Sequence, residues 1–400
     1  MQKLLKLIVF LLSIQILFNF IFILLGFNHP YNIFLFNPND RFADILKTSD
    51  SFGISDTWPG DNSWYRPILN ALPPFQLLLE ISFGYIVKFT NLNELIILFF
   101  IYSIILYVLY SLIHSKLETS FKRSFFFICI LNYGFITFLD RGNSSILTFI
   151  FLLLFLFELD NPKSSMLGLA ISISLKITPI YFFIIILFYK KDQIKGYIYY
   201  LLLYLILINV TSYFFVSNFY KIKFNEIYNL NTFLNGGKAY LNAYLNEGGG
   251  IAYGSSLITF FSFLLLGIKK ILNLKDKIYL PLSQISFILL TLSYYFIYLY
   301  KNYFFKNKFL LILFVFVTYL LFSPVTGDYY LSYLTLPLLY YNENINKKYL
   351  LPIALLLSPK NYLFYYIFSI QIIINPLLMC WILYMLISDL KSEKLKIISK

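Results

Sequence analysis

Charged residues are scarce in this sequence. They make up 13% of its 400 residues, whereas 59% are hydrophobic. A soluble domain carries about 25% charged residues. Apolar runs of roughly 20 residues, the length of a membrane-crossing helix, recur from end to end. This composition excludes an ordinary soluble domain and predicts an all-α, polytopic membrane protein.

Cysteine and histidine are nearly absent too. Cys129 and Cys380 are the two cysteines, and both lie in apolar runs, which excludes a disulfide framework and a CxxC metal site. His29 and His114 are far apart, so we expect no histidine-built metal site and no cofactor. Aspartates in the first polar loop leave a divalent cation, bound through oxygen ligands, as an open alternative.

Positive charge is in excess, with a net charge of +13. In a soluble protein this would point to nucleic acid. Here Lys and Arg cluster in short loops beside apolar runs, where they set membrane topology, so no nucleic-acid partner is expected. The segment from Met1 to Phe27 carries Lys3 and Lys6 before a long apolar run without a small-residue cleavage site. It predicts an uncleaved first span.

The basic clusters also predict how the spans alternate. Placing them in the cytoplasm gives about 12 crossings of the cell membrane in one integral membrane domain, residues 1–400, with both termini cytoplasmic. Two long polar loops then lie outside, at residues 28–91 and about 217–277. The segment Ile68–Lys88 becomes an interfacial or partly embedded helix with Glu80 and Lys88 at its surface.

Two polar breaks interrupt apolar segments that have basic flanks. Asp140–Asn143 divides Ser124–Asn161, and Lys176 divides Met166–Tyr189. The second segment is too short for two full crossings at about 1.5 Å per residue. We expect each to form a hairpin with its polar apex outside. For the second, one proline-kinked span is the alternative. Residues 255–272 are either a span or a helix on the outer face.

Charged side chains at the outer ends of spans are candidates for chemistry, because charge at membrane depth is costly. Asp40 and Asp44 are four residues apart, on one face of a short helix beside the membrane. A carboxylate there suits a general base that deprotonates a sugar hydroxyl. Nearby Arg and Lys suit a phosphate leaving group. This combination fits a lipid-phosphate donor.

Several short motifs follow one another along the chain. They are Asp40 to Asp44, Tyr65-Arg66-Pro67-Ile68-Leu69, Arg141-Gly142-Asn143, Gly168 to Lys176-Ile177-Thr178-Pro179, Gly254-Ser255-Ser256, and Ser323-Pro324 to Tyr330. In this order they resemble polyprenol-phosphate-sugar-dependent glycosyltransferases of the GT-C class, and most closely the multi-span α-mannosyltransferase family. The chain departs from that family at Arg66, where proline is frequent, and around Asp328, where Trp and His are frequent.

The resemblance implies a GT-C-like fold with interfacial helices in the first outer loop. It also implies inverting transfer of a hexose, mannose by likeness, from a polyprenyl-phosphate donor to a lipid or glycan acceptor at the extracytoplasmic face. It assigns the general base to Asp44 or Asp40, which the sequence does not separate. The donor-phosphate candidates are Arg41, Arg141, Asn143 and Lys176, and the substrate-binding candidates are Tyr65, Arg66, Asp328 and Tyr330.

Two other classes remain as alternatives. A lipid-linked oligosaccharide flippase or a polysaccharide polymerase also has about 12 spans and cationic cavities, but a flippase needs no acidic outer loop, and a polymerase is expected to carry its large loop late in the chain. A solute transporter often shows inverted repeats with broken helices. Here two consecutive hairpins repeat, but the half-chain does not.

Overall fold

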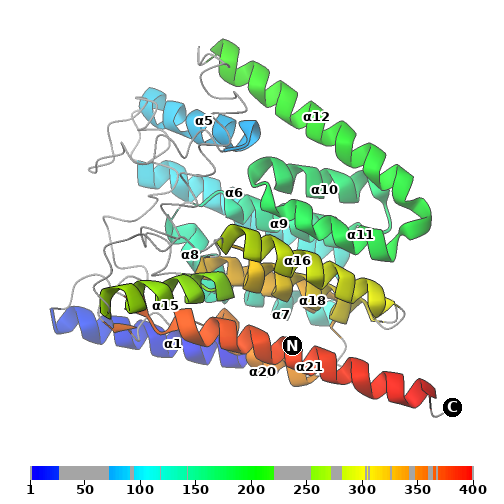
Figure 1. The fold of residues 1–400 in the computed structure, drawn as a ribbon. Coiled ribbons are helices and arrows are strands. Elements are labelled where there is room, and N and C mark those ends of the chain that lie inside the picture. Colours follow the sequence, from blue (N-terminus) through cyan, green and yellow to red (C-terminus); the bar gives the residue numbers. More distant parts are fainter. Residues whose placement is uncertain are drawn as a thin grey trace.

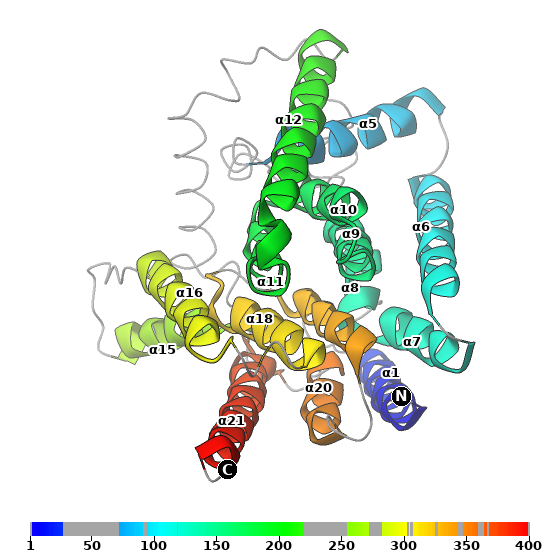
Figure 2. The ribbon, with the colours of Figure 1, turned by 90° about the vertical axis from the view of Figure 1, so that its right-hand side faces the viewer.

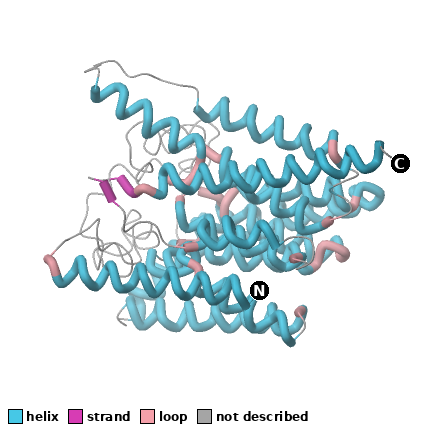
Figure 3. Tube along the Cα trace, turned by 90° about the horizontal axis from the view of Figure 1, so that it is seen from below, coloured by secondary structure: helices cyan, strands magenta, loops and turns pink. Residues whose placement is uncertain are grey.

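The computed structural model is helical through most of the residues it describes. These are residues 2–26, 72–90, 94–117, 119–141, 143–219, 254–271, 282–301, 304, 307–324, 327–341, 347–358, 364–365 and 368–398. Two short strands, β1 (Phe364–Tyr365) and β2 (Phe368–Ser369), pair antiparallel (Figure 3). Apart from this strand pair, the predicted helical class is confirmed.

Helices of very different lengths follow one another along the chain (Figure 1). With 3₁₀ helices marked η, they are α1 (Gln2–Leu24), α5 (Pro74–Thr90), α6 (Glu94–Lys116), α7 (Thr119–Leu131), α8 (Tyr133–Arg141), α9 (Ser145–Phe157), α10 (Pro162–Leu175), η2 (Thr178–Phe182), α11 (Phe183–Tyr189), η3 (Lys191–Gln193), α12 (Ile194–Phe219), α15 (Leu257–Ile271), α16 (Leu282–Leu299), α18 (Lys308–Phe322), η5 (Asp328–Tyr340), η6 (Lys347–Tyr349), α20 (Leu350–Leu357) and α21 (Gln371–Ile398).

Within the described residues, three helices are long and apolar enough to cross a membrane. These segments are Phe99–Lys116, Lys191–Asn218 and Gln371–Leu390. The pair α7 and α8, bent by 59°, would make a fourth. Other apolar helices, including α9 and α18, are shorter, with 13 and 15 residues. At about 1.5 Å per residue, helices of this size cover roughly 20 Å of a hydrocarbon layer near 30 Å thick. The three long helices are compatible with membrane insertion, and the shorter ones do not by themselves reach across such a layer.

The core is organised around α18. Every residue from Phe309 to Leu321 is buried, and a helix that is apolar on all sides must be surrounded by protein or lipid. Here α11, α15, α16, α21 and η5 all contact it. Figure 2 looks nearly along α18 and α9, and shows them inside the ring of outer helices. The side chains of η5 from Leu331 to Leu338 are also buried and complete this core.

Helices α9 and α10 form a tight antiparallel pair. A Cβ atom at Gly168 would lie 2.7 Å from the Phe151 carbonyl oxygen, so only glycine permits this approach. Two buried hydroxyls join the helices. Ser165 donates to the Phe155 carbonyl at 3.2 Å, and Ser172 donates to the Thr148 carbonyl at 3.3 Å. The Gly168 of the resemblance motif therefore has a packing role.

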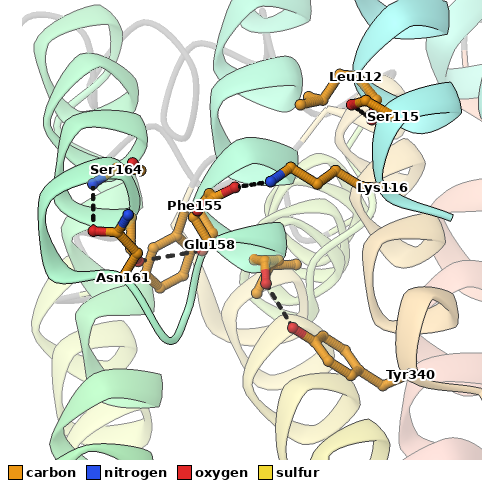
Figure 4. A network of polar contacts seen from close by, with 10 residues as sticks. Leu112, Ser115, Lys116, Phe155, Glu158, Asn161, Ser164 and Tyr340 are labelled. Atoms are coloured by element: carbon orange, nitrogen blue, oxygen red, sulfur yellow. Dashed lines mark hydrogen bonds and ion pairs between the residues drawn. The ribbon is translucent and has the colours of Figure 1, made fainter.

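One end of the helices carries a set of cations with acidic or aromatic partners, which we call the basic end. Lys116 pairs with Glu158 (Figure 4), Lys190 with Asp160 at 2.5 Å, and Lys348 with Asp389. Lys308 lies over the rings of Tyr189 and Tyr340, at 4.5 and 5.5 Å from their centroids, and Tyr340 donates to the Leu156 carbonyl (Figure 4). These contacts join the ends of several helices.

The basic end agrees with the predicted alternation of spans. The sequence predicts Lys116, Lys190, Lys308 and Lys348 on one side of the membrane, and the structure places them together. The Lys190–Asp160 pair also joins both ends of the Met166–Tyr189 region, which confirms the hairpin over the single kinked span. Which compartment the basic end faces stays a prediction.

The structure describes two segments that the sequence places at or near the outer face, α5 and α15. Helix α5, which overlaps most of the predicted Ile68–Lys88 segment, packs on α10 and α12 and crosses α12 (Figure 2), so it is part of the helical bundle. The expectation that Glu80 lies on the surface is wrong, because this side chain is only 4% exposed. Helix α15 contacts α21 and α18 and runs alongside α21 (Figure 1), so it packs against the helical bundle, and whether it spans the membrane stays a prediction.

Candidate functional site

The site begins where the α10–α11 hairpin turns at Lys176. Helix α10 ends at Leu175, and Lys176 has an extended backbone, with φ −150° and ψ 132°. Pro179, the second residue of η2, has no N–H to bond the Leu175 carbonyl and therefore prevents an α-helix from continuing. The sequence thus places a cation at a break between two apolar helices.

Lys176 is half-buried and faces Tyr330 of η5. Its Nζ donates to the Tyr330 hydroxyl at 2.7 Å and lies 5.2 Å from the centroid of the same ring. Tyr330 is 8% exposed. Its ring packs against Phe138 and Tyr333, with centroids at 6.0 and 5.5 Å. This aromatic packing holds the hydroxyl, and the hydroxyl in turn orients the ammonium.

The N-terminus of α9 lies on the other side of Tyr330. The Ser145 hydroxyl donates to the Tyr330 hydroxyl at 3.3 Å. The buried Asn143 side chain accepts from the Ser145 N–H at 2.9 Å and so satisfies one of the N–H groups that a helix leaves free at its start. Tyr330 therefore bridges the two predicted phosphate-binding positions, Lys176 and the apex at Asn143.

Helix α5 adds polar groups that the sequence interpretation missed. The Gln76 amide nitrogen donates to the Glu80 carboxylate at 2.8 Å and to the Ser144 hydroxyl at 3.3 Å. Ser144 stands between Asn143 and Ser145, so α5 contacts the same apex. The available signal in the sequence is an acidic residue within an apolar segment. The same pattern is also typical of the solvent-exposed face of an amphipathic helix, which is why the sequence suggests a surface position for Glu80.

Two motifs of the resemblance also meet at this end. Gly254 and Gly327 form an antiparallel bridge, and Gly327 directly precedes η5 and Tyr330. Ser255 accepts a hydrogen bond from Asn375 of α21 at 2.9 Å. Ser256 caps the start of α15 by accepting from the N–H of Thr259 at 3.1 Å. The small-residue motif therefore anchors α15 beside η5.

The structure describes the side chains of three predicted site residues, Lys176, Tyr330 and Asn143. Helix α8 includes the backbone of Arg141, and η5 begins at Asp328, but their side chains fall outside the described part of the structure. The remaining predicted residues lie outside the described residues altogether: Asp40, Arg41, Asp44, Tyr65 and Arg66. The described geometry is therefore that of the part of the site around Lys176, Tyr330 and Asn143.

The described groups suit an anion. The N-terminus of a helix carries a partial positive charge, and the start of α9 lies one tyrosine away from a lysine ammonium. The ammonium has three donors, of which Tyr330 takes one. Among the described side chains, no group of three His, Cys, Asp or Glu lies close enough to hold a metal ion. The groups described around Tyr330 are thus one cation and several hydrogen-bonding side chains, with the Glu80 carboxylate behind them.

Comparison with known proteins adds no family. No family model matches this sequence. No curated protein and no solved structure matches it either. The residues of this chain, and its motifs that resemble the GT-C class, are therefore what indicates its function.

Proposed function

We propose that this protein is a membrane glycosyltransferase that moves a hexose, mannose by resemblance, from a polyprenyl-phosphate donor to an acceptor hydroxyl at the outer face of the cell membrane. The observation that carries the proposal is the contact of Lys176 with Tyr330 beside the N-terminus of α9. It brings three separate motifs of the resemblance to one end of the helices, opposite the basic end.

In this proposal Lys176 and the start of α9 hold the donor phosphate and stabilise the charge that develops as the sugar leaves. Arg41 and Arg141 are further candidates for that role. Asp44 or Asp40 acts as general base on the acceptor hydroxyl. The hydroxyl of Tyr330 orients Lys176 in the absence of donor. Tyr65, Arg66 and Asp328 are candidates for contacts to the sugar or acceptor.

The proposed topology has about 12 crossings, both termini in the cytoplasm and the Lys176 end outside. This topology is supported by the distance between the basic clusters and the Lys176 site. The basic end and the Lys176 end lie at opposite ends of α9, whose 13 residues span roughly 20 Å. A lipid phosphate reaches such a site from the outer leaflet, and its polyprenyl tail stays in the bilayer.

Purified protein in lipid nanodiscs tests this function. We expect it to transfer labelled sugar from a polyprenyl-phosphate-sugar donor to a glycan or glycolipid acceptor. If it transfers none from any such donor, and instead moves a lipid-linked glycan across the bilayer of sealed vesicles, the flippase alternative replaces this proposal.

A further inference from the structure

Glu80 is an acidic side chain buried inside a membrane protein. It lies on α5, a helix of 17 residues, and is 4% exposed. Burying a carboxylate costs free energy unless other polar groups compensate for the lost water, so a carboxylate at such a position suggests a function. Gln76, one turn earlier and 7% exposed, supplies one compensating hydrogen bond at 2.8 Å.

The amide of Gln76 has two N–H donors, and both have acceptors. One is the Glu80 carboxylate, and the other is the Ser144 hydroxyl at 3.3 Å. A side-chain amide can rotate and can present its oxygen or its nitrogen to a neighbour. Because the Glu80 carboxylate accepts one N–H of this amide, the amide nitrogen of Gln76, and not its oxygen, is turned toward Ser144. Glu80 therefore determines that Ser144 receives a hydrogen-bond donor from Gln76.

Ser144 connects this pair to the Lys176 end. Its neighbours in the chain are Asn143, whose side chain accepts from the Ser145 N–H, and Ser145, which donates to Tyr330 at 3.3 Å. Tyr330 in turn accepts from Lys176. A shift of the Ser144 turn would therefore move the start of α9 and the hydroxyl that orients the lysine.

We infer that Glu80 is a positioning residue for the anion site at Lys176 and the α9 N-terminus. It acts through Gln76 and Ser144 and sets the affinity of that site for a lipid phosphate. This inference rests on the proposed function, because it takes the donor phosphate as the ligand. It adds α5, a helix of the predicted first outer loop, to the donor site.

Farnesyl phosphate, a short lipid phosphate, is the test ligand. Lys176 is labelled with an amine-reactive reagent in the purified full-length protein, and mass spectrometry of its peptide gives the concentration that half-protects it. We expect Glu80→Ala to raise this concentration about tenfold, the size expected for losing a buried charged hydrogen bond. Ser144→Ala should show a similar rise, because it removes the acceptor of Gln76.

Two variants separate positioning from folding. Glu80→Gln keeps an oxygen that accepts from Gln76, so we expect it to stay within about threefold of wild type. Glu158→Gln removes a carboxylate at the basic end and should leave protection unchanged. Thermal melting checks that each variant is folded, and Ser144→Ala carries the test if Glu80→Ala does not fold.

The outcomes distinguish the two proposals. Protection of the wild type with unchanged protection in folded Glu80→Ala and Ser144→Ala overturns the role of Glu80 and leaves the proposed function standing. A Glu80→Gln variant as weak as Glu80→Ala also overturns positioning through Gln76. No protection of wild-type Lys176 at any farnesyl phosphate concentration refutes the lipid-phosphate site itself, and the role of Glu80 with it.

Discussion

The Lys176 ammonium donates a hydrogen bond of 2.7 Å to the Tyr330 hydroxyl, although the two residues are 154 positions apart in the chain. The contact joins the apex of the α10–α11 hairpin to η5. Ser145 donates to the same hydroxyl, so the start of α9 belongs to this group as well. Helices from three parts of the sequence thus place their polar termini around one tyrosine.

Removing the cation should affect transfer far more than folding. We expect Lys176→Ala to reduce sugar transfer about 100-fold, the usual loss when one group that stabilises transition-state charge is removed. Lys190→Ala is the matched control, because Lys190 lies at the basic end. Initial rates of purified variants check this prediction. Equal rates for wild type and Lys176→Ala would remove Lys176 from the donor site.

The close approach of α9 and α10 predicts a specific destabilisation. Gly168→Ala puts a methyl group 2.7 Å from the Phe151 carbonyl oxygen and should cost about 1–3 kcal/mol of unfolding free energy. Gly267→Ala is the control, because nothing lies within 4 Å of its Cβ position in α15. There alanine should stabilise the helix by about 0.5–1 kcal/mol. Thermal melting in detergent measures both. Equal changes in melting temperature for the two variants would contradict the close packing of α9 on α10.

The Lys190–Asp160 pair at the basic end predicts a weak dependence of protein stability on pH. The hydrogen bond from Lys190 lowers the pKa of Asp160, and the same bond raises the pKa of Lys190. A lowered carboxyl pKa contributes stability that is present above the unfolded value of about 3.9 and lost as the pH falls through the folded pKa. The raised lysine pKa contributes stability that is present below about 10.4 and lost as the pH rises through the folded pKa.

Solvent limits the size of this effect. The Asp160 side chain is 73% exposed, so the pair should contribute no more than about 1 kcal/mol. A double-mutant cycle with Asp160→Asn and Lys190→Met at neutral pH and at acidic pH measures the coupling, which should weaken at the acidic pH as Asp160 becomes protonated. A coupling that persists there would show that charge does not hold these ends together.

The two ends of the helices should face different compartments. With Cys380 replaced by serine, because it is exposed, and Cys129 kept, because it is buried, single cysteines at positions 176 and 190 report sidedness. We expect a membrane-impermeant thiol reagent to label Lys176→Cys from outside intact cells, and Lys190→Cys only after the membrane is opened. Labelling of Lys176→Cys only from the cytoplasm would invert the topology and exclude an outer-face site.

Local chemistry explains which parts of this site are predictable from sequence. Lys176 and Pro179 stand together in an apolar segment, and proline ends a helix whatever surrounds it. Basic residues at both flanks then predict the hairpin, which the Lys190–Asp160 pair confirms. These signals are local, so they do not depend on how distant segments pack.

Glu80 shows what the sequence could not predict. A polar face on a helix predicts that the face avoids lipid, but not whether it meets water or another protein segment. In the structure that face meets Ser144, 68 positions from Gln76. Long-range packing decides the difference, and it also decides that Tyr330 meets Lys176. Asp40 and Asp44 lie outside the described residues, so their role stays a prediction.

The catalytic carboxylate is the central claim, and one comparison tests it most directly. Sugar transfer from a polyprenyl-phosphate-sugar donor is measured with purified wild type, Asp40→Asn and Asp44→Asn in the same lipid nanodiscs. We predict that wild type transfers sugar, that both variants melt at the wild-type temperature, and that at least one of them loses transfer. Full activity in both variants would contradict the assignment of the general base to this loop.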